Sequence, residues 1–203
     1  MNLNSNNFLE KVKLFYKKNK IKVTTILIFS CCLYFLLLRS YANPLVTFNR
    51  KKMTEDEKNE ILDLSNAVRR KCNKNLEMLT WNEELEEYAT KTATYLANAR
   101  GCALEHATSY QDIGAGENLA RTVNAPNPIK TAVNLWSEEG YDGSYNHYTA
   151  MNWKDASEIG CGMSKSSCGV VIACNYRSGK GRAMPNLFGY FDENVLCNDP
   201  IYV

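Results

Sequence analysis

The whole chain contains two histidines, and both lie in segments whose side chains could build a chemical site. His106 lies four residues after Cys102 and directly after a glutamate, and His147 directly follows an asparagine. Glu117 and the acidic pair Glu138 and Glu139 lie between them in the sequence. Two neutral imidazoles and two carboxylates that converge on one cleft can bind a divalent metal, transfer protons or hydrogen-bond to one another.

Three segments have the apolar periodicity and the end signals of helices, and these helices must position the site. Residues 54–57 read Thr-Glu-Asp-Glu, the pattern of a capping box, and the helix that follows should end near Cys72. Asn82 can cap a second helix, which Gly101 would close. Pro128 suits the first position of a third helix.

The last third of the domain changes to the pattern of short strands. Ile159–Met163, Gly169–Asn175 and Asn186–Phe191 are expected to be strands, separated by turns rich in glycine and serine. Tyr110–Pro126 contains two glycines and is expected to be a loop. Helices that come first and strands that cluster late predict an α+β domain with an antiparallel sheet.

Residues 1–42 have the composition of a targeting segment. A basic flank precedes Val23–Leu38, an uncharged run of about 16 residues, and Ser40 and Ala42 supply the small residues of a cleavage site before Asn43. The run is short for a membrane span, but the long basic region before it also suits an uncleaved type II signal anchor. Both alternatives place the rest outside the cytoplasm, secreted or anchored, with residues 43–53 as a linker and residues 54–203 as one domain.

The net charge argues against a nucleic-acid partner. After residue 42 the chain has 17 basic and 21 acidic residues, a net charge of −4, so the basic balance of the whole chain comes from its N-terminal segment. No basic stripe interleaves with aromatic residues in the remainder. Contact with a membrane is expected only through the N-terminal segment, if that segment is not cleaved.

Six cysteines follow residue 42, and an even number in a secreted domain indicates disulfides. They are Cys72, Cys102, Cys161, Cys168, Cys174 and Cys197. No Cys-x-x-Cys pair occurs, so a thiolate zinc site is not expected. Six cysteines allow 15 connectivities, and the spacing alone does not choose among them.

Six motifs in consecutive order resemble the CAP superfamily, which includes cysteine-rich secretory proteins, venom allergens and plant pathogenesis-related proteins. The motifs, within residues 60–192, are Leu79–Leu85, Cys102-x-x-x-His106, Gly116–Leu119, Ala132–Glu139, His147–Thr149 and Cys174–Gly179. The resemblance implies a disulfide-stabilised α–β–α sandwich, with a three-stranded antiparallel sheet between helical layers. It also implies the disulfides Cys102–Cys168 and Cys161–Cys174, and leaves Cys72 to pair with Cys197.

The resemblance further implies a cleft with a tetrad of two histidines and two glutamates. The matching residues are His106, Glu117, Glu139 and His147, and the family pattern Trp-x-x-Glu selects Glu139 rather than Glu138. Some members of the family hold zinc or another divalent cation between the histidines, so His106 and His147 are the candidate metal ligands. The alternative is a structural network in which the four side chains bond only to one another and to loop backbone.

Three hypotheses of function remain open. The first is a secreted, non-enzymatic CAP protein that binds a sterol, a fatty acid or an extracellular protein, with Pro126–Leu135 as one edge of a ligand groove. The second is a metal-dependent hydrolase that works through the histidines of the tetrad, with Ser109 and Thr149 as hydroxyls near them in sequence. The third is an extracellular interaction module whose tetrad is purely structural. Because no clear nucleophile stands beside a base, we expect binding rather than catalysis.

Overall fold

The computed structural model describes residues 10, 11, 13–15, 17, 51–141 and 143–197. The apolar run Val23–Leu38 and the cleavage position before Asn43 lie outside the described residues, so the choice between signal peptide and anchor stays a prediction. Within the described residues, the helices are too short or too polar for any of them to cross a bilayer.

Helices and strands alternate along the domain rather than separating into two halves. In order, they are α2 (Glu55–Cys72), β1 (Thr80–Trp81), α3 (Glu83–Ala99), α4 (Ser109–Asp112), β2 (Ala115–Thr122), α5 (Pro128–Glu138), α6 (His147–Met151), β3 (Ala156–Ser166), β4 (Gly169–Ser178) and α7 (Phe191–Asn194).

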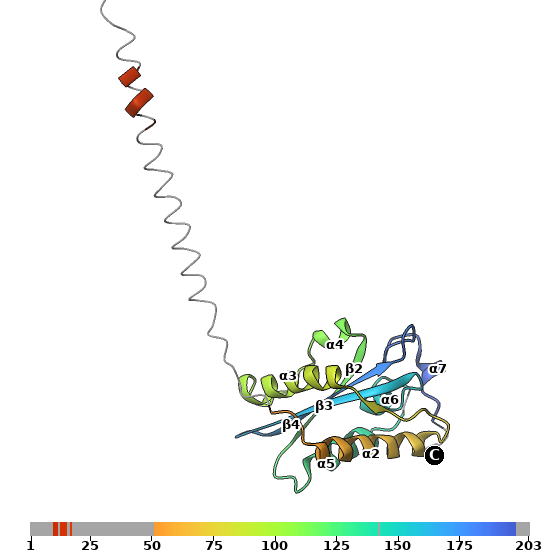
Figure 1. Cartoon of the computed structure of the whole chain (residues 1–203). Coiled ribbons are helices and arrows are strands. Elements are labelled where there is room, and N and C mark those ends of the chain that lie inside the picture. The colour runs from red at the N-terminus through yellow and green to blue at the C-terminus, as the bar shows by residue number, and fades with distance from the viewer. Residues whose placement is uncertain (1–9, 12, 16, 18–50, 142, 198–203) are drawn as a thin grey trace, which may run out of the picture. The chain divides into compact units, whose positions relative to one another are not determined.

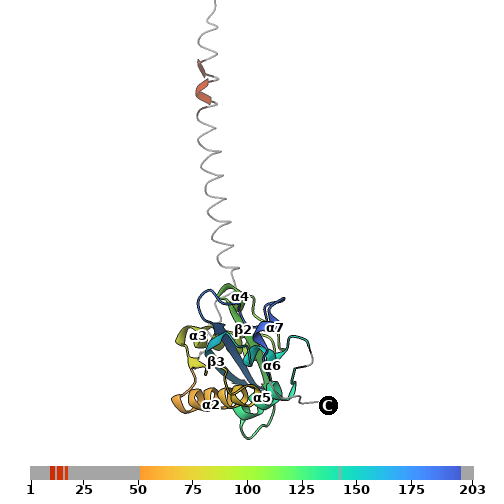
Figure 2. The ribbon, with the colours of Figure 1, turned by 90° about the vertical axis from the view of Figure 1, so that its right-hand side faces the viewer.

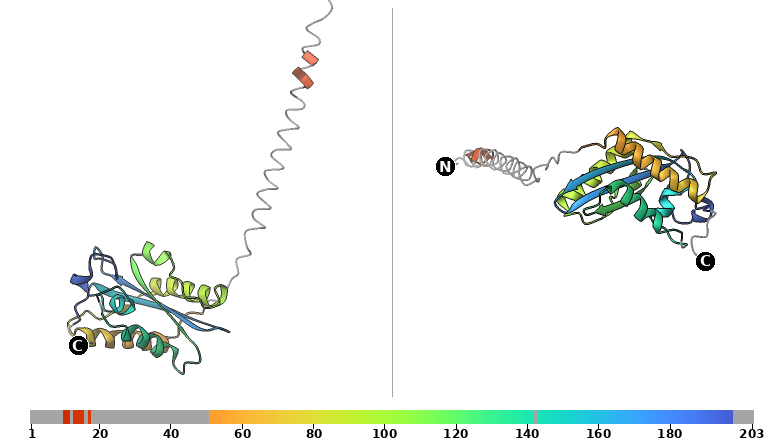
Figure 3. Two further views of the ribbon diagram at one scale, coloured as in Figure 1. Left: turned by 180° about the vertical axis from the view of Figure 1, so that it is seen from behind. Right: turned by 90° about the horizontal axis from the view of Figure 1, so that it is seen from below.

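A sheet lies between two helical layers, as the α–β–α prediction requires. Helices α3 and α4 lie on one side of the sheet, and α2 and α5 lie on the other (Figure 1). Figure 2 shows the same layers from the side, and in Figure 3 α2 and α5 run next to each other over the sheet. The strand order is β1-β3-β4-β2, so β2 is an edge strand.

The sheet has four strands, and the prediction of three was wrong. Strands β2, β4 and β3 form the expected antiparallel set. The fourth strand is β1, whose two residues pair in parallel with Glu158 and Ile159 of β3. Strand β1 has only two residues, in the short connection that leads into α3, so its sequence shows no strand periodicity. It is a strand because it pairs with the edge of β3.

The helix starts follow the predicted caps. The Thr54 side chain accepts the Glu57 N–H, and the Glu57 carboxylate accepts the Thr54 N–H at 2.7 Å, which completes the capping box of α2. The Asn82 side chain caps α3, and Pro128 occupies the first turn of α5. These local signals were sufficient because the two caps satisfy N–H groups of the first turn, and proline there lacks an N–H that would have no helical partner.

Two predictions about the sheet were wrong. The segment predicted as a loop contains β2, whose eight residues are nearly all buried on both faces and so show no alternation. Asn186–Phe191, predicted as a strand, is a turn followed by the start of α7. Its backbone leaves the extended region at Asn186, where φ is 63°, and Phe188 is 90% exposed.

Each face of the sheet has its own apolar core. Leu119, Val171 and Ala173 pack against α3, whereas Ala120, Ile172 and Tyr176 face α2 and α5. Two glycines allow α3 to approach closely, because a Cβ atom on Gly160 would lie 2.2 Å from the Glu86 nitrogen. The second, Gly162, meets Thr90 in the same way, at 2.3 Å from its Cα atom.

A fully buried arginine joins α2 to three other segments. The Arg69 guanidinium donates to the carbonyl oxygens of Met151 and Trp153 at 2.8 Å and of Ala156 at 3.0 Å. It also donates twice to the Glu77 carbonyl, at 2.7 and 2.9 Å. Burial lowers the pKa of Arg69 to about 10, so the group stays charged at neutral pH.

Three disulfides close the domain, in the pairs that the family resemblance implies. They are Cys72–Cys197, Cys102–Cys168 and Cys161–Cys174, with sequence separations of 125, 66 and 13 residues. The first joins the end of α2 to the C-terminal segment after α7, and the third crosses between β3 and β4.

The disulfides should differ in their contribution to stability according to the loops that they close. Each bridge is removed by replacing both of its cysteines with alanine. Removing Cys72–Cys197 should lower the free energy of unfolding by about 2 kcal/mol more than removing Cys161–Cys174, because the longer loop restricts the unfolded chain more. Chemical denaturation of the two double variants measures the difference. Equal losses would show that loop entropy does not govern these bridges.

Candidate functional site

The first half of the tetrad forms as a pair between the loop after α3 and strand β2. His106 Nδ1 lies 3.0 Å from Glu117 Oε1, and the same oxygen accepts the Ala107 N–H at 3.0 Å. The Glu117 side chain is fully buried, whereas the imidazole is 53% exposed. A buried carboxylate thus holds one nitrogen of an accessible imidazole.

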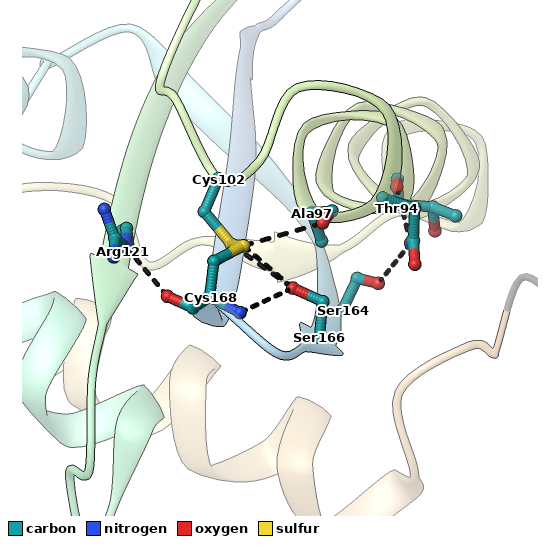
Figure 4. Close-up of a disulfide and its surroundings, with 8 residues drawn as sticks. Thr94, Ala97, Cys102, Arg121, Ser164, Ser166 and Cys168 are labelled. Carbon is teal, nitrogen blue, oxygen red and sulfur yellow. Dashed lines mark hydrogen bonds between the residues drawn. A yellow bond between two sulfur atoms is a disulfide. The ribbon is translucent and has the colours of Figure 1, made fainter.

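The disulfide Cys102–Cys168 fixes the start of the loop that carries His106 (Figure 4). Cys102 has a φ of 61°, so the chain turns sharply as α3 ends. On the other side of the bridge, the Cys168 carbonyl accepts Arg121 Nε at 3.0 Å, and Ser166 Oγ accepts the Cys168 N–H at 3.4 Å. The β3–β4 hairpin and β2 therefore both anchor the loop four residues before the histidine.

The second half of the tetrad forms between the end of α5 and the start of α6. His147 Nδ1 lies 2.5 Å from Glu139 Oε1, and the His147 N–H donates to Glu139 Oε2 at 2.8 Å. Both side chains are about one-third exposed. The Asn146 side chain caps α6 and also donates to the Gly140 carbonyl at 2.8 Å, which holds the connecting loop closed behind the pair.

Successive residues of β2 hold parts of both pairs. Glu117 bonds to His106, and the next side chain, Asn118, donates to the His147 carbonyl at 2.9 Å. The Leu119 carbonyl accepts Trp136 Nε1 at 3.0 Å, and the Trp136 ring stacks near the His147 imidazole with a centroid distance of 6.2 Å. The motif Gly-Glu-Asn-Leu is therefore the scaffold of the site.

Glu117 and Asn118, as neighbouring residues of β2, point to opposite faces of the strand. Glu117 shares a face with Leu119, which packs against α3, and Asn118 shares the other face with Ala120, which packs against α2 and α5. His106 comes from the loop that follows α3, and His147 is the first residue of α6. The described residues contain no group of three or more His, Cys, Asp or Glu side chains that could hold a metal ion.

The hydroxyls considered as nucleophiles are placed differently. Thr149 Oγ1 accepts the Asn146 N–H, and its one proton is within reach of Asn186 Oδ1 at 2.7 Å and the Asn146 carbonyl at 2.9 Å, so the hydroxyl is occupied as a helix cap. Ser109 is the first residue of the four-residue helix α4. The Thr149 contacts do not resemble those of a nucleophile bonded to a base.

These features can be compared with known proteins. The family model of the cysteine-rich secretory protein family, CAP, matches residues 62–176, and that range contains all four tetrad residues. The chain belongs to the CAP family.

Several CAP relatives are similar over the same region. Pathogenesis-related protein 1A of Nicotiana tabacum is 29% identical over 134 residues, which cover 60% of this chain and 75% of the relative. A probable pathogenesis-related protein of Candida albicans is 31% identical over 127 residues, covering 58% of this chain. That match spans only 36% of the Candida protein.

Solved structures of the same fold agree with the observed architecture. Na-ASP-1 has a TM-score of 0.52 at 16% identity, and the match covers 69% of this chain and 43% of that one. A crystal structure of NaASP2 with Zn2+ has a TM-score of 0.51 at 19% identity, covering 68% and 85%. At this level of identity the likeness shows the fold alone.

Sequence reasoning missed two asparagines that hold the second pair, Asn146 and Asn186. Asn146 had a readable signal, because an asparagine three residues before a threonine can form a capping box. Asn186 had another, because Pro185-Asn186 is a typical turn dipeptide. Both were hidden by the expectation of a strand and a loop in these places.

A separate hollow of about 740 Å³ lies between the segment before α2, the β2–α5 loop and the β3–β4 hairpin. Pro126 and Pro128, from the expected groove edge Pro126–Leu135, are among its lining residues. Met163 and Val170 contribute apolar surface, and Lys165 contributes an ammonium group. The hollow shares no lining residue with the tetrad.

The geometry fixes the expected tautomer of both imidazoles. Because each Nδ1 faces a carboxylate oxygen, each neutral ring should carry its proton on Nδ1 and leave the Nε2 lone pair free. Long-range ¹H–¹⁵N correlation spectra of the full chain above neutral pH distinguish the two tautomers. A protonated Nε2 on either ring would contradict the assignment of that pair.

Proposed function

We propose that this chain is a secreted CAP protein that acts by binding rather than catalysis, and that His106 and His147 hold a divalent cation such as zinc. The observation that carries the proposal is the repeated pairing of an imidazole Nδ1 with a glutamate carboxylate. In metal sites, this outer carboxylate orients the ring and makes Nε2 a better ligand.

The donor set suits an open site rather than a closed structural one. Glu117 and Glu139 already bond to the histidines, so they serve as the outer carboxylates, and two Nε2 atoms remain as protein ligands. Zinc prefers four ligands, so water or a partner's donor group would complete the shell. When bound, the ion would offer a Lewis-acidic position to an oxygen or nitrogen donor of a partner. The same fold has been crystallised with Zn2+ in NaASP2.

The contacts of the nearby hydroxyls favour binding over the hydrolase alternative. A metal-dependent hydrolase needs three protein ligands as a rule, or a nucleophile beside a base. Thr149 is engaged in capping, and both glutamates of the tetrad are engaged by Nδ1 atoms. With each glutamate holding an imidazole and no third ligand at hand among the described residues, the arrangement suits binding better than metal-dependent hydrolysis.

The proposal of secretion rests on the N-terminal segment and on the disulfides. A basic flank followed by an apolar run and small residues matches a secretory signal. Three disulfides are stable in an oxidising compartment, and the matched family is described as cysteine-rich secretory proteins.

Calorimetric zinc titration of the full chain tests the metal proposal. The wild type should bind one ion, and the double variant His106→Ala/His147→Ala should show no binding. Glu139→Gln keeps the shape of the side chain but removes its charge, so it should weaken binding about 10–100-fold, the usual effect of an outer-shell change. Acidification should displace the ion, because a protonated imidazole has no lone pair to donate.

Glu138→Ala is the matched control, since the neighbouring glutamate has no part in the tetrad and should leave zinc affinity unchanged. Equal affinity of the wild type and the double-histidine variant would overturn the metal proposal. The tetrad would then be a structural network.

The hollow beside the β2–α5 loop supports a second candidate function, binding of an amphipathic anion such as a fatty acid. Its volume of about 740 Å³ is in the range of small-molecule sites. Met53, Met163 and Val170 offer apolar surface, and Lys51 and Lys165 can pair with a carboxylate at the rim. This combination favours a fatty acid over an uncharged sterol.

Displacement of a fluorescent fatty acid tests the second candidate. Lys165→Glu should weaken binding, because it reverses a charge at the rim, whereas Lys180→Glu, which is outside this hollow, should not. Equal weakening by both variants would indicate a general charge effect and not this site. If the chain bound neither zinc nor fatty acid, the interaction-module hypothesis would be favoured.

A further inference from the structure

The segment between β4 and α7 contains a tight turn that the proposed metal site does not use. The Leu187 N–H donates to the Met184 carbonyl at 3.1 Å, so Pro185 and Asn186 are the central residues of a β-turn. Asn186 has a φ of 63°. A type II turn requires a positive φ at its third position and favours proline at its second, and asparagine tolerates that φ better than most residues.

The base of this turn is attached to the core. The Ala183 carbonyl accepts Trp153 Nε1 at 3.1 Å and Ser178 Oγ at 2.6 Å. Trp153 is fully buried. The turn therefore projects from a fixed point.

Pro185 lies directly on β2. A Cβ atom added to Gly116 would be 2.8 Å from Pro185 Cβ and 3.2 Å from the Pro185 carbonyl oxygen. Real Cβ atoms do not approach this closely, so only glycine allows the contact. Gly116 is the residue immediately before Glu117, which holds His106.

Asn186 lies directly on the start of α6. Its Nδ2 donates to the Asn146 carbonyl at 2.9 Å, and its Oδ1 accepts Thr149 Oγ1 at 2.7 Å. Asn146 is the N-cap of α6 and the residue immediately before His147. The two side-chain bonds hold the first turn of the helix on which the second histidine lies.

We propose that the Pro185–Asn186 turn is a positioning device that sets α6 against β2, and so sets the spacing between the two His/Glu pairs. One turn residue contacts the neighbour of Glu117, and the next contacts the neighbour of His147. Asn118, through the His147 carbonyl, is a second tie between the same elements. The consequence for metal binding rests on the proposed function, but the positioning itself does not.

A reporter of this spacing exists without any metal. The His147 imidazole stacks near the Trp136 ring at 6.2 Å and 25°, and Trp136 Nε1 is held by the Leu119 carbonyl of β2. The ring current of Trp136 shifts the carbon-bound ring protons of His147. Their chemical shifts therefore report the position of α6 relative to β2.

The test compares three variants of the full chain by NMR. Gly116→Ala should push Pro185 away and shift the His147 ring protons, and adding Pro185→Gly should return them toward the wild type by removing the opposing Cβ. Asn186→Gly keeps the positive φ but removes both side-chain bonds, so it should shift the same protons. Gly179→Ala is the control, because its Cβ would meet nothing closer than Arg182 Cγ at 3.9 Å.

The outcomes separate this proposal from the metal proposal. The positioning role would be overturned if the His147 ring-proton chemical shifts in Asn186→Gly were unchanged, or changed no more than in Gly179→Ala. If Gly116→Ala does not fold, Asn186→Gly alone decides. If the wild type binds zinc, the shifted variants should bind about tenfold more weakly or worse, as for loss of other outer-shell partners. Unchanged zinc affinity in the shifted variants would show that the spacing does not govern the site. Failure of the wild type to bind zinc would overturn the proposed function and leave the shift test valid.

Discussion

The buried guanidinium of Arg69 is the constraint on which the rest of the domain depends. A charged group with no exposure to solvent is tolerated only when its hydrogen-bond donors have acceptors. Here four backbone carbonyl oxygens accept from the guanidinium. These carbonyls belong to the segment before β1, the end of α6, and the entry to β3. One side chain of α2 therefore fixes the course of three segments that are distant in the sequence.

This constraint reaches the candidate site through α6. The Met151 carbonyl, at the last residue of α6, is bonded to Arg69, so the helix is held at its C-terminal end. Its N-terminal end is held by the Asn146 cap, by Asn118 and by the Pro185–Asn186 turn. A five-residue helix has little stability of its own, and tertiary contacts at both ends supply what its length does not. His147 is thus positioned by the core rather than by its local sequence.

The sequence predicted the features that are local and failed on those that are tertiary. The caps at Thr54 and Asn82 were predictable because they satisfy neighbouring backbone groups. The tetrad residues could be named by family resemblance, but their division into two His/Glu pairs could not, because the partners of each pair come from different elements. Strand β2 was missed because a glycine such as Gly116, taken alone, indicates a loop. The structure requires glycine there because Pro185, about 70 residues away in the sequence, packs against it.

We propose that His106 and His147 bind one metal ion through their Nε2 atoms. X-ray absorption spectroscopy of the zinc-loaded full chain tests it most directly, because the scattering pattern of imidazole rings counts the histidine ligands. The expected result is two imidazole nitrogens at about 2.0–2.1 Å, with oxygen donors completing the shell. A shell with one imidazole, or with sulfur at about 2.3 Å, would contradict it.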